Sequence, residues 1–473
     1  MFRSKTLTGI LKVSFSNLCI VLSGIFVGFI IPKILGVTEY GYYKIFTLYS
    51  VYVGIFSMGI SEGMYLKYSG ISYTNLDKSK IRAFTHIVAI LEFCVALLIA
   101  ILSFIFFKGQ YRVIFIALSI YLFSLNMTTY YQYVAQMTLR FSDYSMRNII
   151  RSIFNIISTL ILTFFYYFNQ KKFISYKYYL FSVLFISIIL LLMYIKKFKE
   201  VSFGSKNDFM NYKDELIELM KLGIPFLIAS VCSTLILTID SQFISVLFNM
   251  RIYGMYAFAY NLLSLVTVFT SAISVVLYPT LKQLKQSTLV SKYHTLSSYV
   301  FCFVYLSLFI YFPLCIFIKK FLPQYIESLV FFRIVFPGLA FSSVISVVIQ
   351  NYYKIINKNN LFFYENLAVL GISFIANSIA YYIFRTPESI SFASVLTLII
   401  YYILAEVYFV KNYHIRWRKN FTYALFMMFI FYIITSVSDI YIGGITYILV
   451  FLCISFIFYH RLVKDLFIHL IHK

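Results

Sequence analysis

The chain has 473 residues, of which 61% are hydrophobic and only 12% are charged. A soluble globule of this size cannot hide so much apolar surface from water, so the composition excludes a soluble protein and predicts one that is embedded in lipid. The net charge of +23 does not indicate nucleic acid as a partner, because the Lys and Arg residues lie in short loops between apolar runs, as membrane orientation requires.

Fourteen apolar segments follow one another along the chain, each near the roughly 20 residues that a helix needs to cross the membrane core. They are 12–32, 41–63, 83–107, 112–135, 148–168, 177–195, 222–247, 253–279, 296–318, 328–351, 361–384, 390–410, 421–437 and 441–460. The first is preceded by Arg3, Lys5 and Lys12 and lacks a small-residue cleavage pattern, so we expect it to stay in the membrane. The sequence therefore predicts an all-α polytopic membrane protein with about 14 transmembrane helices.

The middle of the chain, residues 196–221, carries eleven charged side chains. This charged linker separates an N-terminal bundle of six helices, 1–195, from a C-terminal bundle of six, 222–410, and residues 411–473 add two helices and a tail. Within the linker, Asp214–Met220 alternates acidic and apolar residues, which predicts a short surface helix before the seventh segment.

Loop charges predict the orientation. With the N-terminus inside, the cytoplasmic loops collect about 28 of the 40 Lys and Arg residues, which favours two cytoplasmic termini and an even number of spans. Apart from the linker, no loop exceeds about 20 residues, so the chain has no room for an external catalytic domain. The six Cys residues lie in apolar segments without CxxC or His spacing, so we expect no disulfide, metal site or cofactor.

Each half of the chain repeats one pattern. Tyr40-Gly41-Tyr42-Tyr43 begins the second segment, and Tyr253-Gly254-Met255-Tyr256 begins the eighth. Small and polar residues then recur at intervals of three and four, which places each set on one helix face. The sets are Thr47, Ser50, Gly54, Ser57 and Ser61 in the first half, and Ser264, Thr267, Ser271, Ser274 and Tyr278 in the second. Such stripes either allow close helix packing or line a cavity shared by both halves.

Several short motifs together resemble the polysaccharide transporter family, which includes the O-antigen flippases. They are Pro32-Lys33-Ile34-Leu35-Gly36, the first Tyr-Gly repeat, Leu222-Gly223-Ile224-Pro225, Asp240, Gly254-Met255-Tyr256 and Pro279. One departure is that Ser245-Val246-Leu247-Phe248 stands where a second Pro-x-x-Leu-Gly is expected.

The resemblance implies a transporter and not an enzyme, with two six-helix bundles around a central cleft and two added helices, in the bacterial inner membrane. It also implies the substrate: an undecaprenyl-diphosphate-linked oligosaccharide, such as an O-antigen or capsule repeat unit. This substrate would move from the cytoplasmic to the periplasmic leaflet, and a glycan polymerase is a further expected partner beside the membrane lipids.

Two carboxyl groups lie at membrane depth. Glu92 is near the middle of the third segment and Asp240 is in the outer part of the seventh. Because a charge is costly there, both are candidates for binding the coupling ion. The alternative is a structural acid held neutral by apolar surroundings.

Basic residues supply candidates for holding a diphosphate, which requires cations. Lys44 and Arg333 lie toward the periplasmic ends of their segments, although either side chain can instead extend to the membrane interface. Arg82 with His86, and Arg147 with Arg151, lie four residues apart near cytoplasmic ends. These residues either admit the lipid diphosphate from the inner leaflet or reflect the loop charge bias alone.

Two other functions stay open at this stage. A drug or cation antiporter of the same superfamily would need carboxylates in its cleft, whereas a lipid diphosphate needs cations, and the counts do not decide between them. A membrane polymerase or glycosyltransferase would need catalytic groups on a large external loop, and the first outer loop offers only Lys33 and Glu39.

Overall fold

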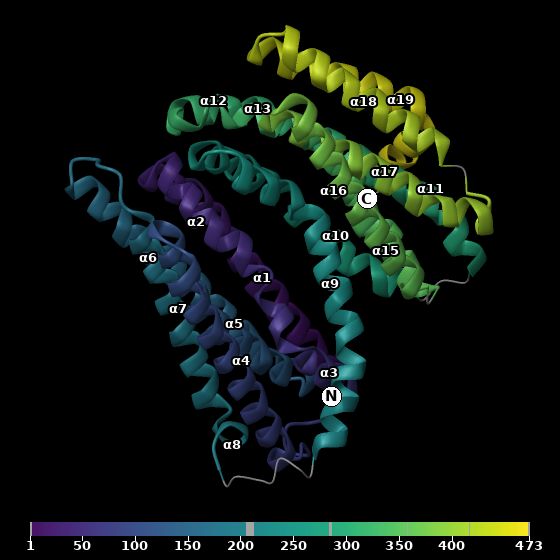
Figure 1. Cartoon of the computed structure of the whole chain (residues 1–473). Helices are drawn as coiled ribbons and strands as arrows, with labels where there is room; N and C mark the ends of the chain where they lie inside the picture. The colour runs from purple at the N-terminus through teal and green to yellow at the C-terminus, as the bar shows by residue number, and fades with distance from the viewer. Residues whose placement is uncertain (1, 205–211, 283–285, 357, 416, 472–473) are drawn as a thin grey trace. The chain divides into compact units, whose positions relative to one another are not determined.

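The computed structural model describes residues 2–204, 212–282, 286–356, 358–415 and 417–471. These residues form helices joined by short loops, without a β-strand, which confirms the all-α fold (Figure 1). The chain divides into two compact units, Met1–Thr234 and Leu235–Lys473, and the division falls inside one long helix.

The first unit contains the helices from the N-terminus to the first part of α9. They are α1 (Phe2–Leu35), α2 (Val37–Ser50), the 3-10 turn η1 (Val53–Ser57), α3 (Ile60–Tyr68), α4 (Lys78–Phe106), α5 (Gly109–Met137), α6 (Phe141–Phe168), α7 (Tyr176–Lys197), α8 (Lys199–Ser202) and α9 (Lys213–Leu247). Helix α1 packs along α6, while α5 packs against α4, α7 and α2. The buried centre is rich in aromatic side chains, among them Phe84, Tyr130, Tyr131 and Tyr194.

The second unit continues from the end of α9. It contains α10 (Met250–Lys282), α11 (Gln286–Ser307), η3 (Leu308–Ile310), α12 (Tyr311–Phe321), η4 (Pro323–Tyr325), α13 (Ser328–Val335), η5 (Phe336–Gly338), α14 (Leu339–Val344), the π-helical turn η6 (Ile345–Ile349), α15 (Gln350–Ile355), α16 (Asn359–Phe384), α17 (Pro387–Tyr413), α18 (Arg418–Val437) and α19 (Ile440–Ile471). Helices α18 and α19 pack on each other and on α11.

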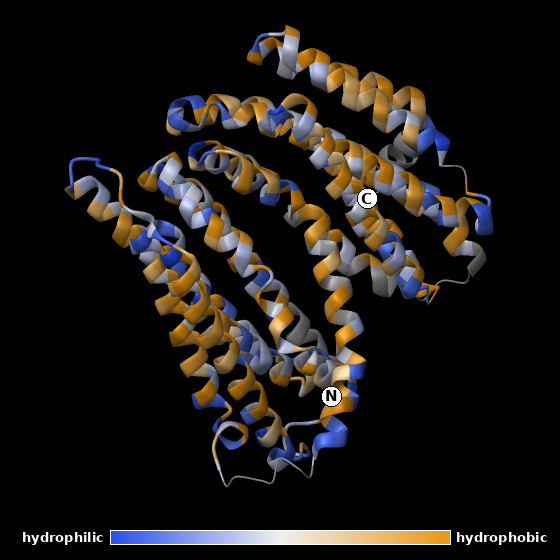
Figure 2. Ribbon diagram, in the orientation of Figure 1, coloured by the Kyte–Doolittle hydropathy of each residue, from blue (hydrophilic) through white to orange (hydrophobic). Residues whose placement is uncertain are grey.

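Most of these helices are long and apolar enough to cross a membrane. Eleven qualify among the described residues, or twelve if α2 and α3 count as one bent span. The two remaining segments of the sequence prediction, 222–247 and 253–279, fall on α9 and α10. Figure 2 shows hydrophobic residues along the helices and hydrophilic residues toward many helix ends. Large exposed apolar side chains on α4, such as Phe93, Leu97 and Phe104, fit a surface that faces lipid.

The second span is broken, although the sequence predicts one continuous helix over 41–63. Helix α2 ends at Ser50, η1 follows, and Met58 and Gly59 adopt left-handed backbone angles of φ 49° and 72° before α3 begins. The two helical parts are bent by 61°. Glycine and β-branched residues, which lower helix propensity, are frequent in Val51–Gly59. The prediction of one continuous helix was based on the spacing of polar residues and did not take this low helix propensity into account.

Glycines bring α3 and α9 together within the first unit. A Cβ on Gly223 of α9 would collide with the backbone of Gly59 and Gly63, and a Cβ on Gly63 would collide with the backbone of Leu219. Only residues without a side chain allow two helix backbones to approach so closely. Close helix packing therefore depends on Gly59, Gly63 and Gly223, whereas Gly54 of the predicted stripe has no neighbour within 4 Å of a Cβ at its position.

Ion pairs continue this contact toward the start of α9. The Glu215 carboxylate lies 3.1 Å from Lys67 Nζ and 2.9 Å from Lys80 Nζ, and it accepts a hydrogen bond from the Tyr68 hydroxyl. The sequence prediction of a separate surface helix before the seventh segment is therefore wrong. Asp214–Met220 is the first part of α9, because its apolar side packs on the buried cluster of the first unit, which includes Leu219.

We expect this contact to depend on pH through Glu215. Burial raises the pKa of this carboxyl group, but the hydrogen bonds from Tyr68, Lys80 and Lys67 outweigh it and lower the pKa from 4.5 to about 2. A lowered pKa stabilises the fold above pH 4.5, and this contribution is lost as the pH falls through about 2. Acid titration of the melting temperature should show that loss in the native chain.

Matched variants assign the acid effect. Glu215→Gln should remove much of the acid-induced loss of stability, because an amide does not titrate. Asp214→Asn is the control, since Asp214 is exposed and forms no ion pair in the described part of the chain. An equal change in both variants would contradict the assignment to Glu215.

Candidate functional site

A pocket of about 220 Å³ lies inside the first unit, between α5, α6 and α7. These three helices pack on one another, and a hydrogen bond of 2.8 Å between the Ser124 and Ser187 hydroxyls joins α5 to α7. The lining is partly polar and partly aromatic. It consists of Tyr121, Leu125, Thr128, Thr129, Gln132, Arg147, Asn148, Arg151, Asn155, Val183, Ile186, Ser187, Leu190 and Tyr194.

Helical periodicity brings the polar residues to this pocket. On α6, Arg147, Arg151 and Asn155 follow one another at intervals of four, so they share one helix face. On α5, Thr128 and Gln132 have the same spacing. Two polar helix faces therefore meet at a pocket that α7 completes.

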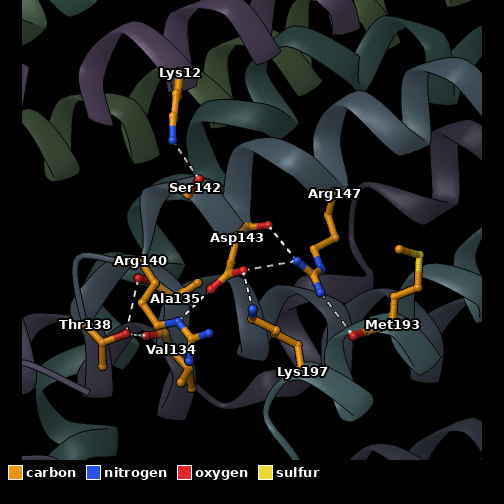
Figure 3. A network of polar contacts seen from close by, with 10 residues as sticks. All are labelled: Lys12, Val134, Ala135, Thr138, Arg140, Ser142, Asp143, Arg147, Met193 and Lys197. Atoms are coloured by element: carbon orange, nitrogen blue, oxygen red, sulfur yellow. Dashed lines mark hydrogen bonds and ion pairs between the residues drawn. The ribbon is translucent and has the colours of Figure 1, made fainter. Parts of the chain in front are cut away.

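Arg147 is held in place by its neighbours (Figure 3). Its Nη1 donates to the backbone oxygen of Asp143 at 3.3 Å, with the Asp143 carboxylate at 3.5 Å. Its Nη2 donates to the backbone oxygen of Met193 on α7 at 3.3 Å. The guanidinium group lies 5.1 Å from the centre of the Tyr194 ring, a cation–π distance. These contacts fix the guanidinium group at the pocket wall.

Asp143 is the centre of this network, because its carboxylate is shared by three cations. It lies 2.6 Å from Arg140 and 3.3 Å from Lys197 in addition to Arg147 (Figure 3). One carboxylate neutralises at most one positive charge, so the region keeps an excess of positive charge. Lys12 of α1 lies nearby and donates to Ser142 at 3.0 Å.

Three polar atoms of the lining are buried without a hydrogen-bond partner among the described residues. They are Arg147 Nε, Asn148 Nδ2 and Thr128 Oγ1. The three residues are at most 9% exposed. A buried donor without a partner costs about 1–3 kcal/mol, so native structures rarely keep several at one place unless a ligand or water uses them.

The pocket's chemistry fits an anion that also carries hydroxyl groups. Two arginines line it, and no Asp or Glu appears among the described lining residues. Amides and hydroxyls supply further donors, while Tyr121 and Tyr194 offer ring surface. The volume is below the range of about 300–1,000 Å³ that holds drug-sized ligands, so the pocket has room for only a part of a large ligand.

The other predicted cations lie elsewhere. Arg82 of α4 donates through Nη2 to the backbone oxygen of Glu200 at 2.8 Å, so it anchors α8. Lys44 of α2 stacks over the ring of Tyr40, with 5.3 Å between Nζ and the ring centre. In the second unit, Arg333 of α13 donates to the backbone oxygen of Thr435 on α18 at 3.4 Å.

The two predicted carboxyl groups are both buried but differ in their partners. Glu92 of α4 accepts a hydrogen bond of 2.8 Å from Asn126 through Oε2. In the second unit, Asp240 accepts hydrogen bonds from the hydroxyls of Tyr256 and Tyr260 and from the backbone of Ser241. Tyr256 belongs to the Tyr-Gly-x-Tyr repeat, so one role of that motif is to hold Asp240.

Most hydroxyls of the two predicted stripes bond to the backbone. Thr47, Ser50 and Ser57 donate to residues three positions earlier, as do Ser264 and Thr267. Ser61 is buried on α3, past the break, and Ser274 donates to the backbone oxygen of Ser346. The side chain of Ser271 lies outside the described residues. The break between α2 and α3 also means that the first stripe does not follow one straight helix.

Several residues of the pocket escape sequence analysis. Asn148 and Thr128 of the lining, and Asp143 beside it, carry no membrane-depth charge signal, and Arg147 with Arg151 is equally explained by the excess of basic residues at cytoplasmic helix ends. Asn155, however, continues the Arg147 and Arg151 spacing deeper into the segment. The polar face that these three residues form along the otherwise apolar helix α6 was the sequence feature that could have indicated this site.

The comparisons with known proteins agree with this architecture. A family model described as "Polysaccharide biosynthesis protein" matches residues 7–285. A search of curated proteins gave no match.

Several solved structures share the fold, among them the following three. The lipid II flippase MurJ, in an inward closed conformation, aligns with a TM-score of 0.68 at 16% identity, covering 97% of this chain and 100% of that one. The Vibrio cholerae MATE transporter VcmN, solved as a mutant, aligns with a TM-score of 0.53 at 12% identity, covering 86% and 96%. An inward-facing multidrug resistance MATE transporter of the MOP superfamily aligns with a TM-score of 0.50 at 13% identity, covering 86% and 98%.

The TM-scores show a common fold at low sequence identity. The family match covers more than half of the chain and shows the family. The family resemblance stated from the sequence motifs is thereby confirmed. The chain is a multi-pass membrane protein that shares the fold of these transporters and belongs to the polysaccharide biosynthesis protein family.

Proposed function

We propose that this protein is a flippase that moves an undecaprenyl-diphosphate-linked oligosaccharide, an O-antigen or capsule repeat unit, from the cytoplasmic to the periplasmic leaflet. The observation that carries the proposal is the pocket between α5, α6 and α7. Its described lining contains two arginines and no acidic residue, and three of its buried polar atoms have no hydrogen-bond partner among the described residues. A diphosphate supplies the anionic oxygens that such donors bind. The family membership supports a glycan precursor as cargo.

The charge of the pocket lining favours this function over drug antiport. A cationic drug at the same position would meet Arg147 and Arg151 and find no carboxylate among the described lining residues. Like charges would then disfavour binding. We therefore prefer the lipid diphosphate over the antiporter, although MATE transporters share the fold.

Arg147 is the central binding residue in this proposal. Asp143 and Met193 each accept a hydrogen bond from one terminal nitrogen, whereas Nε is buried and has no partner among the described residues, so we propose it as the donor to a phosphate oxygen once the ligand reaches it. Asn148 and Arg151 flank it along α6 and extend the contact to further oxygens. Arg82, Lys44 and Arg333 are proposed as further contacts of the diphosphate along its path, each requiring the release of its present partner.

We further propose that an ion gradient drives translocation. Binding of an ion at a buried carboxyl group changes the charge of that group. If two conformations of the protein bind the ion with different affinities, the ion gradient shifts the equilibrium between them. Glu92 and Asp240 are the two candidates. The hydroxyl stripes, among them Ser50 and Ser264, are proposed to border the path of the polar head group.

The proposed location is the bacterial inner membrane, with both termini in the cytoplasm and a glycan polymerase as a partner. Reporter fusions check the topology: Lys171, Arg251 and Arg385 should report the periplasm, and Lys206, Lys285 and Trp417 the cytoplasm. The reason is the excess of basic residues in the second group of loops. Fusions at Arg251 and Lys285 that report the same side would contradict the arrangement.

A deletion strain tests the proposed function. Without this protein, undecaprenyl-linked repeat units should accumulate on the cytoplasmic face and the surface polymer should disappear, because no other step brings the precursor across. The native gene on a plasmid should restore the polymer. Normal surface glycan in a deletion strain that lacks other flippases would overturn the proposal.

A further inference from the structure

The break in the second span is linked to Glu92 by one side chain. Asn126 of α5 donates through Nδ2 to the backbone oxygen of Val53 at 3.0 Å and to Glu92 Oε2 at 2.8 Å. Val53 is the first residue of η1, the turn between α2 and α3. All three residues are buried, with exposures of 2% for Val53, 0% for Glu92 and 5% for Asn126.

The second oxygen of Glu92 is unoccupied. Oε1 is buried and has no hydrogen-bond partner among the described residues. A carboxylate in that position keeps one charged oxygen without compensation, which is expensive in an apolar span. A single proton removes the charge. A metal ion would need more ligands, and the described residues contain no group of three His, Cys, Asp or Glu that could hold one.

The charged groups around Glu92 belong to its own helix and to the elements packed against it. Helix α4 packs against α5, α8 and η1. Glu92 accepts a hydrogen bond from the Asn126 amide of α5, and Glu62 of α3 interacts with Glu92 electrostatically. Toward α8, Arg82 and His86 bond to backbone oxygens, and His86, the nearer of the two, lies about 9 Å away along the helix. Because Glu62 and Glu92 repel each other when both are charged, a proton on Glu92 relieves the repulsion.

Asp240 does not share these features. Two tyrosine hydroxyls and a backbone amide donate to its oxygens, so both oxygens have partners. It also lies within the continuous helix α9. Its surroundings are those of a structural carboxyl group.

We propose that Glu92 is a proton-binding site and that Asn126 transmits its charge to the break in the second span. A charged carboxylate is the stronger acceptor, so it holds the Asn126 amide beside Val53 and supports the bend. When Glu92 takes a proton from water, the hydrogen bond to Oε2 weakens and Asn126 is released. The backbone oxygen of Val53 then needs a new donor, which a straightened helix provides. Only the link from this switch to glycan transport depends on the proposed function.

Infrared difference spectroscopy tests the proton site in the full-length protein, reconstituted in lipid without any glycan substrate. A pH step should produce the carbonyl band of a protonated carboxyl group. Glu92→Gln should remove one component of that band and abolish the acid-induced change in label distance described below. Glu406→Gln is the matched control, because Glu406 is 1% exposed and also has one unpartnered oxygen in the described structure, but lies within the unbroken helix α17. It should remove at most a different component and leave the distance change intact. A band unchanged in Glu92→Gln, or the same component lost in both variants, overturns the assignment.

Distance measurement tests the bend. Spin labels are attached at Thr38 on α2 and Leu66 on α3, two exposed positions on either side of the break. The labelled chain has its six native cysteines replaced by Ala. The distance should increase on acidification, because straightening a 61° bend separates the labels. Asn126→Leu should keep the infrared band but remove the pH dependence of the distance. An unchanged pH response in Asn126→Leu overturns the role of Asn126.

The ion and the cargo are tested separately. Adding Na⁺ at constant pH should leave the label distance unchanged, and a shift equal to that caused by acid would assign Glu92 to Na⁺ and overturn the proton site. Since neither readout contains the lipid-linked glycan, a failed flippase assay leaves these outcomes intact. Conversely, a flippase that works normally in Glu92→Gln retains the proposed function and removes Glu92 from it.

Discussion

Arg147→Ala should nearly abolish translocation while the protein still reaches the membrane. A hydrogen bond to a charged group contributes roughly 1.5–3 kcal/mol, and about 1.4 kcal/mol is a factor of ten in binding, so we expect an affinity loss of about tenfold to a hundredfold. The free Nε and the fixed orientation of the guanidinium group are the structural reasons. Binding of a short-chain lipid diphosphate to the purified protein measures the loss directly.

Arg140→Ala is the matched control for Arg147. Arg140 pairs with the same Asp143 carboxylate at 2.6 Å but is not among the residues that line the pocket. Its removal takes one cation from the network and leaves the pocket wall intact, so binding should change little. Arg147→Lys should recover only part of the affinity, because an ammonium group cannot replace the planar donor set. Equal losses for Arg140→Ala and Arg147→Ala would point to net charge and not to the pocket.

Gly223→Val should give the largest loss of stability among single substitutions in the first unit. A Cβ at this position meets the backbone of Gly59 and Gly63, and backbone atoms cannot move aside as a flexible side chain does. Overpacking in a rigid contact typically costs about 1–3 kcal/mol, and we expect the upper end or more here. The melting temperature of the purified protein in detergent, together with the fraction that remains monodisperse after heating, measures the effect.

Gly371→Ala is the control for this prediction. A Cβ at Gly371 of α16 has no neighbour within 4 Å, so the substitution should be neutral or slightly stabilising, since Ala favours a helix over Gly by about 1 kcal/mol. Gly63→Ala should behave like Gly223→Val, though less severely. If Gly223→Val melts at the native temperature, the α3–α9 contact is looser than the structure indicates.

The sequence alone determined the class of fold and the family. Apolar runs of membrane-spanning length are a local property, so the all-α polytopic fold could be predicted by counting residues. Short motifs such as Leu222-Gly223-Ile224-Pro225 also carry their information locally, and the family match agrees with them. The four-residue spacing of Arg147 and Arg151 near a predicted cytoplasmic helix end is likewise a local property of the sequence.

Tertiary structure decided what these residues do. The pocket joins Thr128, Arg147 and Tyr194 from three helices, and no spacing rule says which helix faces meet. Likewise, Asn126 contacts Glu92 and Val53 across two other elements, so its role cannot be read from its own segment. The break at Met58 and Gly59 was not predicted from the sequence, because hydropathy does not distinguish a bent span from a straight one. Side-chain composition fixes how much of a chain enters the membrane, whereas contacts between distant segments fix which polar groups are left without a partner.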